Sequence, residues 1–168
     1  PNRTVPVIAA VNGMAVGGGF EIAMAADMMV AADHAQFWLP EAALGILPDA
    51  GSVRLPKLLP PQLAREVLYA GRRLSAADAE RFGIVNRVVP GAELLTAARE
   101  LAGRVVANAP LSVAAIMDIE RRAAQLDPIE AMAQIRTSDS SRRPIPSDDA
   151  QEGTVAFGEK RPPVWQGR

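Results

Sequence analysis

The sequence contains no cysteine and only one histidine, His34. The absence of cysteine excludes disulfide bonds and thiol chemistry, and it fits an intracellular, cytoplasmic protein. A single histidine excludes a metal site built from several histidines and argues against a Ser-His-Asp catalytic triad. Any chemistry of this chain therefore has to come from other side chains or from the backbone.

Charge of one sign is also lacking, because 18 basic and 19 acidic side chains leave a formal net charge of −1. This balance gives no indication of a nucleic acid or a membrane surface as a partner. No apolar run reaches the ~20 residues that a membrane-spanning helix needs, and no signal-peptide pattern is present. The 168 residues, of which 49% are hydrophobic, match about one globular domain.

What the sequence does contain is a run of small and apolar residues around three consecutive glycines at 17–19. The apolar residues 5–11 predict a buried strand before this turn, and residues 18–26 predict a helix after it. Glu21 lies just inside that helix, and Glu41 follows a proline and opens another helix-like stretch. Free N–H groups at a glycine-rich helix start can hold a developing negative charge, and two nearby carboxylates can move protons.

Short strand-like segments follow this turn. Residues 28–32 predict a second strand and residues 35–38 a third extended piece, which makes a βαβ-like unit with a right-handed crossover. Asp49 stands where it would cap a helix that runs towards Leu59. Further expected elements are one turn over 41–45, helices over 62–69 and 75–83, and a strand-like run over 84–89.

The character of the sequence changes after Pro90. Amphipathic helices are expected over 92–107, 110–126 and 128–136, and a last short helix over 150–160. The polar segment 137–149 contains two prolines and is expected to be a mobile connection. We therefore divide the chain into residues 1–89, which carry the glycine turn, and a helical region over 90–168.

Four blocks of the sequence carry a specific family resemblance. They read VPVIAAVNGMAVGGGFEIAMAADMMVAA, AQFWLPEAALGILPDAG, LYAGRRLSAADAERFGIVNRVV and EGTVAFGEKRPPVWQGR. Together they resemble the crotonase superfamily of enoyl-CoA hydratases and isomerases over essentially the whole chain. Within the superfamily, GGGFE, AGRR and GIVNRVV are similar to the branch that acts on carnitinyl-CoA.

The resemblance implies an α/β fold with a crotonase-like ββα spiral core. Residues 1–89 would be the C-terminal part of this core, and residues 90–168 would form a helical region for trimerisation and for capping CoA. Family members carry a further segment before this point, so we expect this chain to be truncated at its N-terminus. That segment supplies one of two oxyanion N–H donors and much of the CoA-binding surface.

The same resemblance assigns roles in the glycine turn. It implies that the N–H of Gly18 is an oxyanion donor for a thioester enolate, with Gly17 and Gly19 as flanking substrate-binding residues. It also implies that Glu21 and Glu41 hold a water and act as acid and base, with either assignment open. From the residues alone, the glycines equally permit tight strand–helix packing, and each glutamate is equally an ordinary acid at a helix start.

Asp49 departs from the hydratase pattern. Simple hydratases usually carry glycine at this position, whereas some isomerases of the superfamily carry an acid that transfers protons. The alternatives are a helix N-cap and electrostatic attraction of a trimethylammonium group.

The resemblance also places Lys160 near the 3′-phosphate of CoA, and the alternative for this residue is a solvated charge. It places Phe157 near the acyl chain or adenine, and the alternative for this residue is a place in the core. Trp38 either lines the acyl pocket or packs in the core.

The expected function is that of an acyl-CoA hydratase or dehydratase, a lyase that adds or removes water across the 2,3-double bond of an enoyl-CoA. One alternative is an enoyl-CoA or dienoyl-CoA isomerase that uses Asp49. Another is an inactive fragment that only folds or oligomerises. No metal or other cofactor is expected, because CoA arrives as part of the substrate. The expected partners are an acyl-CoA and further copies of the chain in a homotrimer or hexamer.

Overall fold

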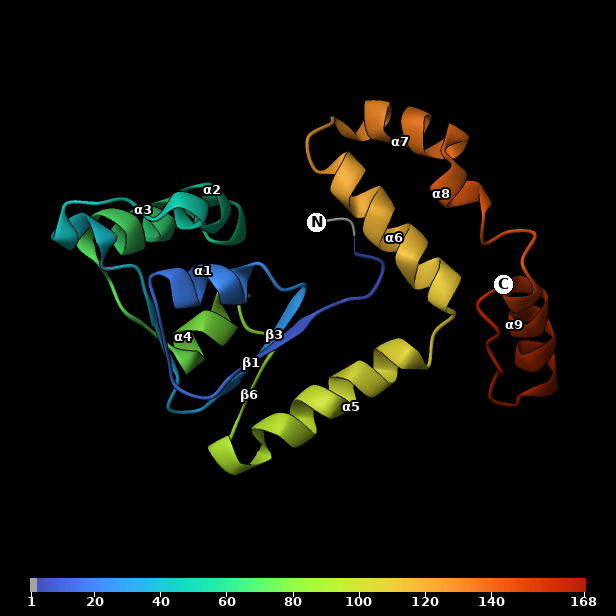
Figure 1. Cartoon of the computed structure of the whole chain (residues 1–168), viewed down its shortest axis with the longest axis horizontal. Helices are drawn as coiled ribbons and strands as arrows, with labels where there is room; N and C mark the ends of the chain where they lie inside the picture. Colours follow the sequence, from blue (N-terminus) through green and yellow to red (C-terminus); the bar gives the residue numbers. More distant parts are fainter. Residues whose placement is uncertain (1–2) are drawn as a thin grey trace. The chain divides into compact units, whose positions relative to one another are not determined.

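The computed structural model describes residues 3–168 and divides into two compact units. The first, called the sheet unit below, comprises Val7–Leu101. The second, called the helical unit, comprises Ala102–Arg168 together with the residues up to Pro6. In Figure 1 the sheet unit runs from blue to yellow-green and most of the helical unit from yellow to red. The functional division expected at residue 89 stays a prediction.

A parallel three-stranded sheet with the strand order β1-β3-β6 forms part of the sheet unit. β1 (Ile8–Val11) pairs with β3 (Met28–Ala32), and β3 pairs with β6 (Arg87–Val89). Helix α1 (Gly18–Met24) lies between β1 and β3 along the chain. The parallel strands joined through a helix, expected from the sequence, are therefore confirmed.

The strand expected over residues 5–11 is shorter than predicted, and the expectation that it is buried was wrong, because Ala10 is exposed and the other residues of β1 are only partly buried. The N–H of Val7 donates to Oδ2 of Asp27 (2.7 Å), and the carbonyl of Val7 accepts from the N–H of Asp27 (3.0 Å). The loop before β3 therefore takes the backbone groups that a longer strand would use. The ladder starts only at Ile8, opposite Met28, and Val7 is exposed.

A second three-stranded sheet has the order β2-β4-β5. β2 (Met14–Val16) runs parallel to β4 (Gln36–Trp38), and β5 (Leu74–Ser75) pairs with β4 in antiparallel fashion. The extended piece expected at residues 35–38 is confirmed as β4. β2 was not predicted, because three residues are too few for a strand period to show against the neighbouring glycines.

Local start and stop signals set two helices of the sheet unit. Helix α3 (Pro61–Ala70) begins at a proline and ends at Gly71, whose φ of 65° is left-handed. Helix α4 (Ala76–Arg81) has a capping box, in which the Ser75 side chain and the Asp78 side chain each accept from the other's backbone N–H. Both helices were predicted, with bounds close to these.

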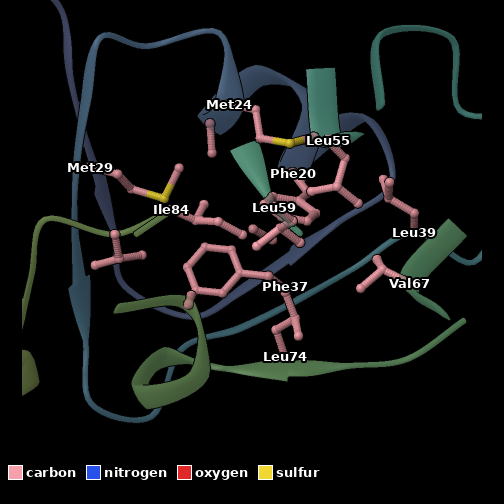
Figure 2. Packing of buried hydrophobic residues seen from close by; sticks show 14 of the residues in the cluster. Phe20, Met24, Met29, Phe37, Leu39, Leu55, Leu59, Val67, Leu74 and Ile84 are labelled. Atoms are coloured by element: carbon pink, nitrogen blue, oxygen red, sulfur yellow. The ribbon is translucent and has the colours of Figure 1, made fainter. Parts of the chain in front are cut away.

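The main hydrophobic core joins the elements that carry the candidate site. Figure 2 shows Phe20 of α1 beside Phe37 of β4, with ring centroids 5.3 Å apart. Leu55 of α2 (Asp49–Leu58) and Val67 of α3 belong to the same buried cluster. Because the cluster packs at crystal-like density, it fixes α1, α2 and β4 against one another.

The helical unit contains the end of α5 (Leu94–Val106) and the helices after it. These are α6 (Pro110–Ala123), α7 (Pro128–Thr137), α8 (Asp139–Arg142) and α9 (Asp148–Glu159). In Figure 1, α7 and α8 lie beside α6. The mobile connection expected over 137–149 is wrong, because Ser138 and Ser147 cap the starts of α8 and α9. Taken singly, no helix between residues 3 and 168 is long and apolar enough to cross a membrane. One bent pair of segments, Gly91–Val106 and Pro110–Ala123, reaches that length and composition only when the two are counted together.

Candidate active site

Two parallel strands end side by side at the candidate site. β2 ends at Val16 and β4 at Trp38, and the N–H of Gly17 continues the ladder by donating to the carbonyl of Trp38 (3.0 Å). The segments that follow these strands therefore emerge at the same edge of the sheet, where ligands bind in many α/β proteins. One segment is the glycine turn at 17–19, and the other leads to Glu41.

The first glycine of the turn has a backbone conformation that glycine alone adopts freely. Gly17 has φ 53° and ψ −125°, and its carbonyl accepts from the N–H groups of Phe20 (2.9 Å) and Glu21 (3.0 Å). These two bonds start α1. The N–H groups of Gly18 and Gly19 make no hydrogen bond to any residue that the structure describes. Two unpaired donors thus lie exposed at the helix start.

Glu41 is a buried acid at the start of the 3-10 helix η1 (Glu41–Leu44), with 8% of its surface exposed. Its Oε1 lies against Gly17, so close that a Cβ at that glycine would be 2.6 Å away. Its Oε2 is closed to solvent and has no hydrogen-bond partner within residues 3–168. Because a buried polar atom without a partner is costly, such an atom marks a position kept for something other than stability.

Glu21 is held from a different element. Its Oε1 accepts a hydrogen bond from the backbone N–H of Gly51 (2.7 Å) in the first turn of α2. The start of α2 therefore fixes one oxygen of this half-buried carboxylate and leaves the other oxygen without a protein partner among the described residues. Gly51 was missed at the sequence level, because a backbone N–H contact across 30 positions leaves no local signal.

Asp49 does not cap α2, so this expectation was wrong. It is the first helical residue and is exposed, and Pro48 holds the N-cap position, with no side-chain hydrogen bond there. The reason is that the carbonyl of Pro48 already accepts from the N–H of Ser52 (2.9 Å), which makes Pro48 the start of the helix. The carboxylate of Asp49 is left without a protein partner in the described part of the chain.

Trp38 is half-buried, and one face of its ring is covered by a cation. The guanidinium carbon of Arg73 lies 4.4 Å from the ring centroid. The two residues are neighbours across strands, because Phe37 is opposite Leu74 in the β4–β5 ladder. This cation–π contact was not predicted from the sequence.

Phe157 and Lys160 belong to the helical unit, on and just after α9. The core alternative for Phe157 is wrong, because 88% of its surface is exposed. Lys160 is exposed and has a left-handed φ of 55°, the one positive φ outside glycine among the described residues. Their expected contacts with CoA stay predictions, whereas the glycine turn, Glu21 and Glu41 lie together within the sheet unit.

Comparison with known proteins places this geometry in a family. A family model described as enoyl-CoA hydratase/isomerase matches residues 2–168. Carnitinyl-CoA dehydratase of Escherichia coli K12 is 54% identical over 170 residues, which cover 99% of this chain and 65% of that protein. The carnitinyl-CoA dehydratase of Shigella flexneri gives the same values. The chain thus spans 65% of the length of these curated relatives.

A solved structure of enoyl-CoA hydratase from Mycobacterium tuberculosis H37Rv superposes with a TM-score of 0.94 at 37% identity, covering 99% of this chain and 66% of that one. Enoyl-CoA hydratase from Bacillus anthracis gives 0.93 at 38% identity, with 98% and 64% covered. The expected α/β crotonase fold is confirmed by these superpositions. The chain belongs to the enoyl-CoA hydratase/isomerase family.

Proposed function

We propose that this chain carries the proton-transfer site of an acyl-CoA hydratase or dehydratase. The observation that carries the proposal is that two acids adjoin one glycine turn, Glu41 through its contact with Gly17 and Glu21 as a residue of the first turn of α1. Glu41 presents a buried oxygen without a partner, and Glu21 presents a carboxylate with only one oxygen fixed. The names of the relatives, carnitinyl-CoA dehydratase and enoyl-CoA hydratase, support an enoyl-CoA thioester and water as reactants.

The glycine turn would stabilise the charge that the reaction develops. When the oxygen of water bonds to the β-carbon, the electrons of the double bond move to the thioester oxygen, which becomes an enolate. The N–H of Gly18 would donate to this oxygen, beside a second donor that the family resemblance expects from outside the chain. One such donor contributes about 2.7–4 kcal/mol to a complete site. Gly17 and Gly19 would let the backbone approach the thioester closely.

The two acids would divide the proton transfers. Glu21, with one oxygen held by Gly51, would use the other to take a proton from the attacking water. Glu41 would deliver a proton to the α-carbon, which completes the addition of H and OH. The reverse sequence removes water. Exchanging the two roles gives the same net reaction, so the assignment is part of the test.

CoA would enter as part of the substrate, with no metal or further cofactor. Phe157 and Lys160 would contact its adenine and 3′-phosphate end, where the lysine supplies a positive charge. Trp38 and the exposed Asp49 are the candidates for contact with the acyl group. The helices after Pro90 would join subunits into a trimer or hexamer, as the family resemblance implies.

The test is a screen of acyl-CoA thioesters on the protein, with crotonyl-CoA and carnitinyl-CoA among them. Loss or gain of the conjugated thioester absorbance reports hydration or dehydration. We expect Glu21→Gln and Glu41→Gln each to lower turnover by about 10²–10⁴-fold. A fully active Glu41→Gln enzyme would remove the acid–base pair from the mechanism. Measuring the 168-residue chain by itself beside a version extended at its N-terminus to the length of the relatives decides whether the chain alone is inactive.

A second candidate function is double-bond isomerisation. The observation that favours it is the free carboxylate of Asp49, which is not used as a helix cap. In this case Asp49 and Glu41 would move a proton between two carbons of the substrate without adding water. Double-bond migration on an enoyl-CoA, in the absence of any hydration of crotonyl-CoA, would establish the isomerase and exclude the hydratase.

A further inference from the structure

We propose that Gly17 is the positioning residue for Glu41, and that its lack of a side chain keeps that carboxylate in place. The proposal rests on the proposed function, because it gives the placement of Glu41 a catalytic purpose. It separates the first glycine of the turn from the two that follow. This role of Gly17 is exerted through Glu41 and is separate from the approach of its backbone to the thioester.

The space beside Gly17 is too small for a side chain. A Cβ on Gly17 would lie 2.6 Å from Oε1 of Glu41 and 3.6 Å from its Cδ, whereas ordinary contact begins at 3.4 Å. Any side chain at this position would therefore displace the carboxylate. Because Oε2 is closed to solvent, the carboxylate has little room to retreat on its other side.

The backbone of Gly17 is hydrogen-bonded to both segments that carry the acids. Its N–H donates to the carbonyl of Trp38, at the end of the strand that leads to Glu41. Its carbonyl accepts from the N–H of Glu21 (3.0 Å). One residue is thus bonded to the segment that leads to one acid and to the backbone of the other, so it joins the two backbone segments from which the carboxylates extend.

The other two glycines of the turn provide a contrast. A Cβ on Gly18 or on Gly19 would meet nothing within 4 Å, and neither has a left-handed φ. The chain itself therefore requires glycine only at the first of the three positions. At the other two the space is open, which leaves it free for a ligand.

The experiment pairs Gly17→Ala with Glu41→Asp in the protein. Glu41→Asp shortens the side chain by one C–C bond, about 1.5 Å, and so removes the clash that alanine creates. We expect Gly17→Ala to lower kcat by about 10²–10⁴-fold with KM nearly unchanged. Adding Glu41→Asp to Gly17→Ala should raise kcat by about tenfold, although Glu41→Asp alone lowers it.

Gly71→Ala is the matched control. Gly71 also has a left-handed φ (65°), but a Cβ there would meet nothing within 4 Å. Its ψ of 29°, against −125° at Gly17, makes the backbone strain of alanine there milder, and there is no clash, so kcat should not change. A Gly17→Ala enzyme with full kcat would overturn the proposal, and so would additive losses in the double variant, because they would leave backbone strain as the sole effect.

Thermal unfolding keeps the proposal testable when Gly17→Ala is poorly folded or when no substrate is turned over. Adding Glu41→Asp should raise the melting temperature of Gly17→Ala but not that of Gly71→Ala. Equal changes in the two backgrounds would overturn the contact. If the wild-type protein turns over no acyl-CoA while this rescue is seen, the proposed function fails and the positioning contact stands.

Discussion

Two buried carboxylates, one in each unit, differ in how their oxygens are satisfied. Glu41 of the sheet unit has 8% of its surface exposed and an Oε2 without a partner in the described chain. Asp149 of the helical unit has 2% exposed, and its oxygens accept from the backbone N–H groups of Gln166 (2.6 Å) and Gly167 (3.0 and 3.2 Å). Both oxygens of Asp149 are hydrogen-bonded within the protein, whereas Oε2 of Glu41 is not.

Hydrogen bonding of the buried oxygens distinguishes an acid that stabilises the fold from an acid that is available for a reaction. Burial of a carboxylate costs free energy that hydrogen bonds can offset, as they do at Asp149, where charge-assisted bonds hold the C-terminal tail onto α9. At Glu41 the cost is only partly offset, so the fold gains little from the carboxylate. A reaction partner that supplies the missing hydrogen bond would explain why an acid stands there.

The largest expected effect is on turnover at Glu41. Glu41→Met keeps the length of the side chain and removes the unpaired oxygen. We expect turnover to fall by about 10²-fold or more, while the free energy of unfolding stays equal or rises. Enzyme assays and denaturant unfolding of the same preparation measure both.

Glu80→Met is the control for this change. Oε1 of Glu80 accepts from the N–H of Val88 (2.9 Å), so this acid has a partner that the substitution leaves unpaired. We expect a small loss of stability and unchanged turnover. If Glu41→Met loses more stability than Glu80→Met, Glu41 stabilises the fold as Asp149 does, and the distinction between the two acids is wrong.

The second largest expected effect is a lower free energy of unfolding when Asp149 is replaced. Asp149→Ala leaves the N–H groups of Gln166 and Gly167 unpaired, and we expect the free energy of unfolding to fall by about 2–3 kcal/mol. Amide hydrogen exchange of residues 164–168 should become faster in the folded protein. Asp148→Ala next to it removes only an exposed ion pair with Arg168 (3.2 Å) and should change stability by about 0–1 kcal/mol. Equal losses in the two variants would contradict the structural role of Asp149.

The sequence was most informative where the determinants are local. Pro61 and Gly71 bracket a helix, and Ser75 with Asp78 begins the next one, because proline geometry, left-handed glycine and side-chain caps act within a few residues. The family resemblance added the α/β crotonase fold. A local reading failed at Asp49, where the helix begins one residue earlier than a side-chain cap would place it.

The details that distinguish the two acids were beyond the sequence. Nothing in the residues around Glu41 shows that Gly17 packs on its carboxylate, and nothing near Asp149 shows that Gln166 folds back to it. Both contacts depend on chain segments that meet only in the folded protein. The same holds for Gly51 and Glu21. Sequence could therefore locate the candidate acids, but not say which of them the fold leaves unsatisfied.

A smaller effect is expected from a local determinant of the sheet unit. Ser75→Ala removes the cap of α4, and we expect the free energy of unfolding to fall by about 1 kcal/mol in denaturant titration. Thr96→Ala in α5 is the control, because an exposed helix position gains slightly from alanine. Equal stabilities of the two variants would show that the capping box does not contribute.

The smallest effect is expected at the half-buried Glu152 of the helical unit, and it depends on pH. Hydrogen bonds from Arg161 (2.6 and 2.9 Å), and then from the N–H of Val164 (2.8 Å), lower the pKa of Glu152 from 4.5 to about 2. Between these two values the unfolded chain binds more protons than the folded one, so stability is lost as the pH falls through this range. Glu152→Gln should flatten this part of the wild-type pH profile of unfolding. If the profiles of the two proteins run parallel from pH 5 to pH 2, Glu152 does not hold the tail, and Asp149 carries that role alone.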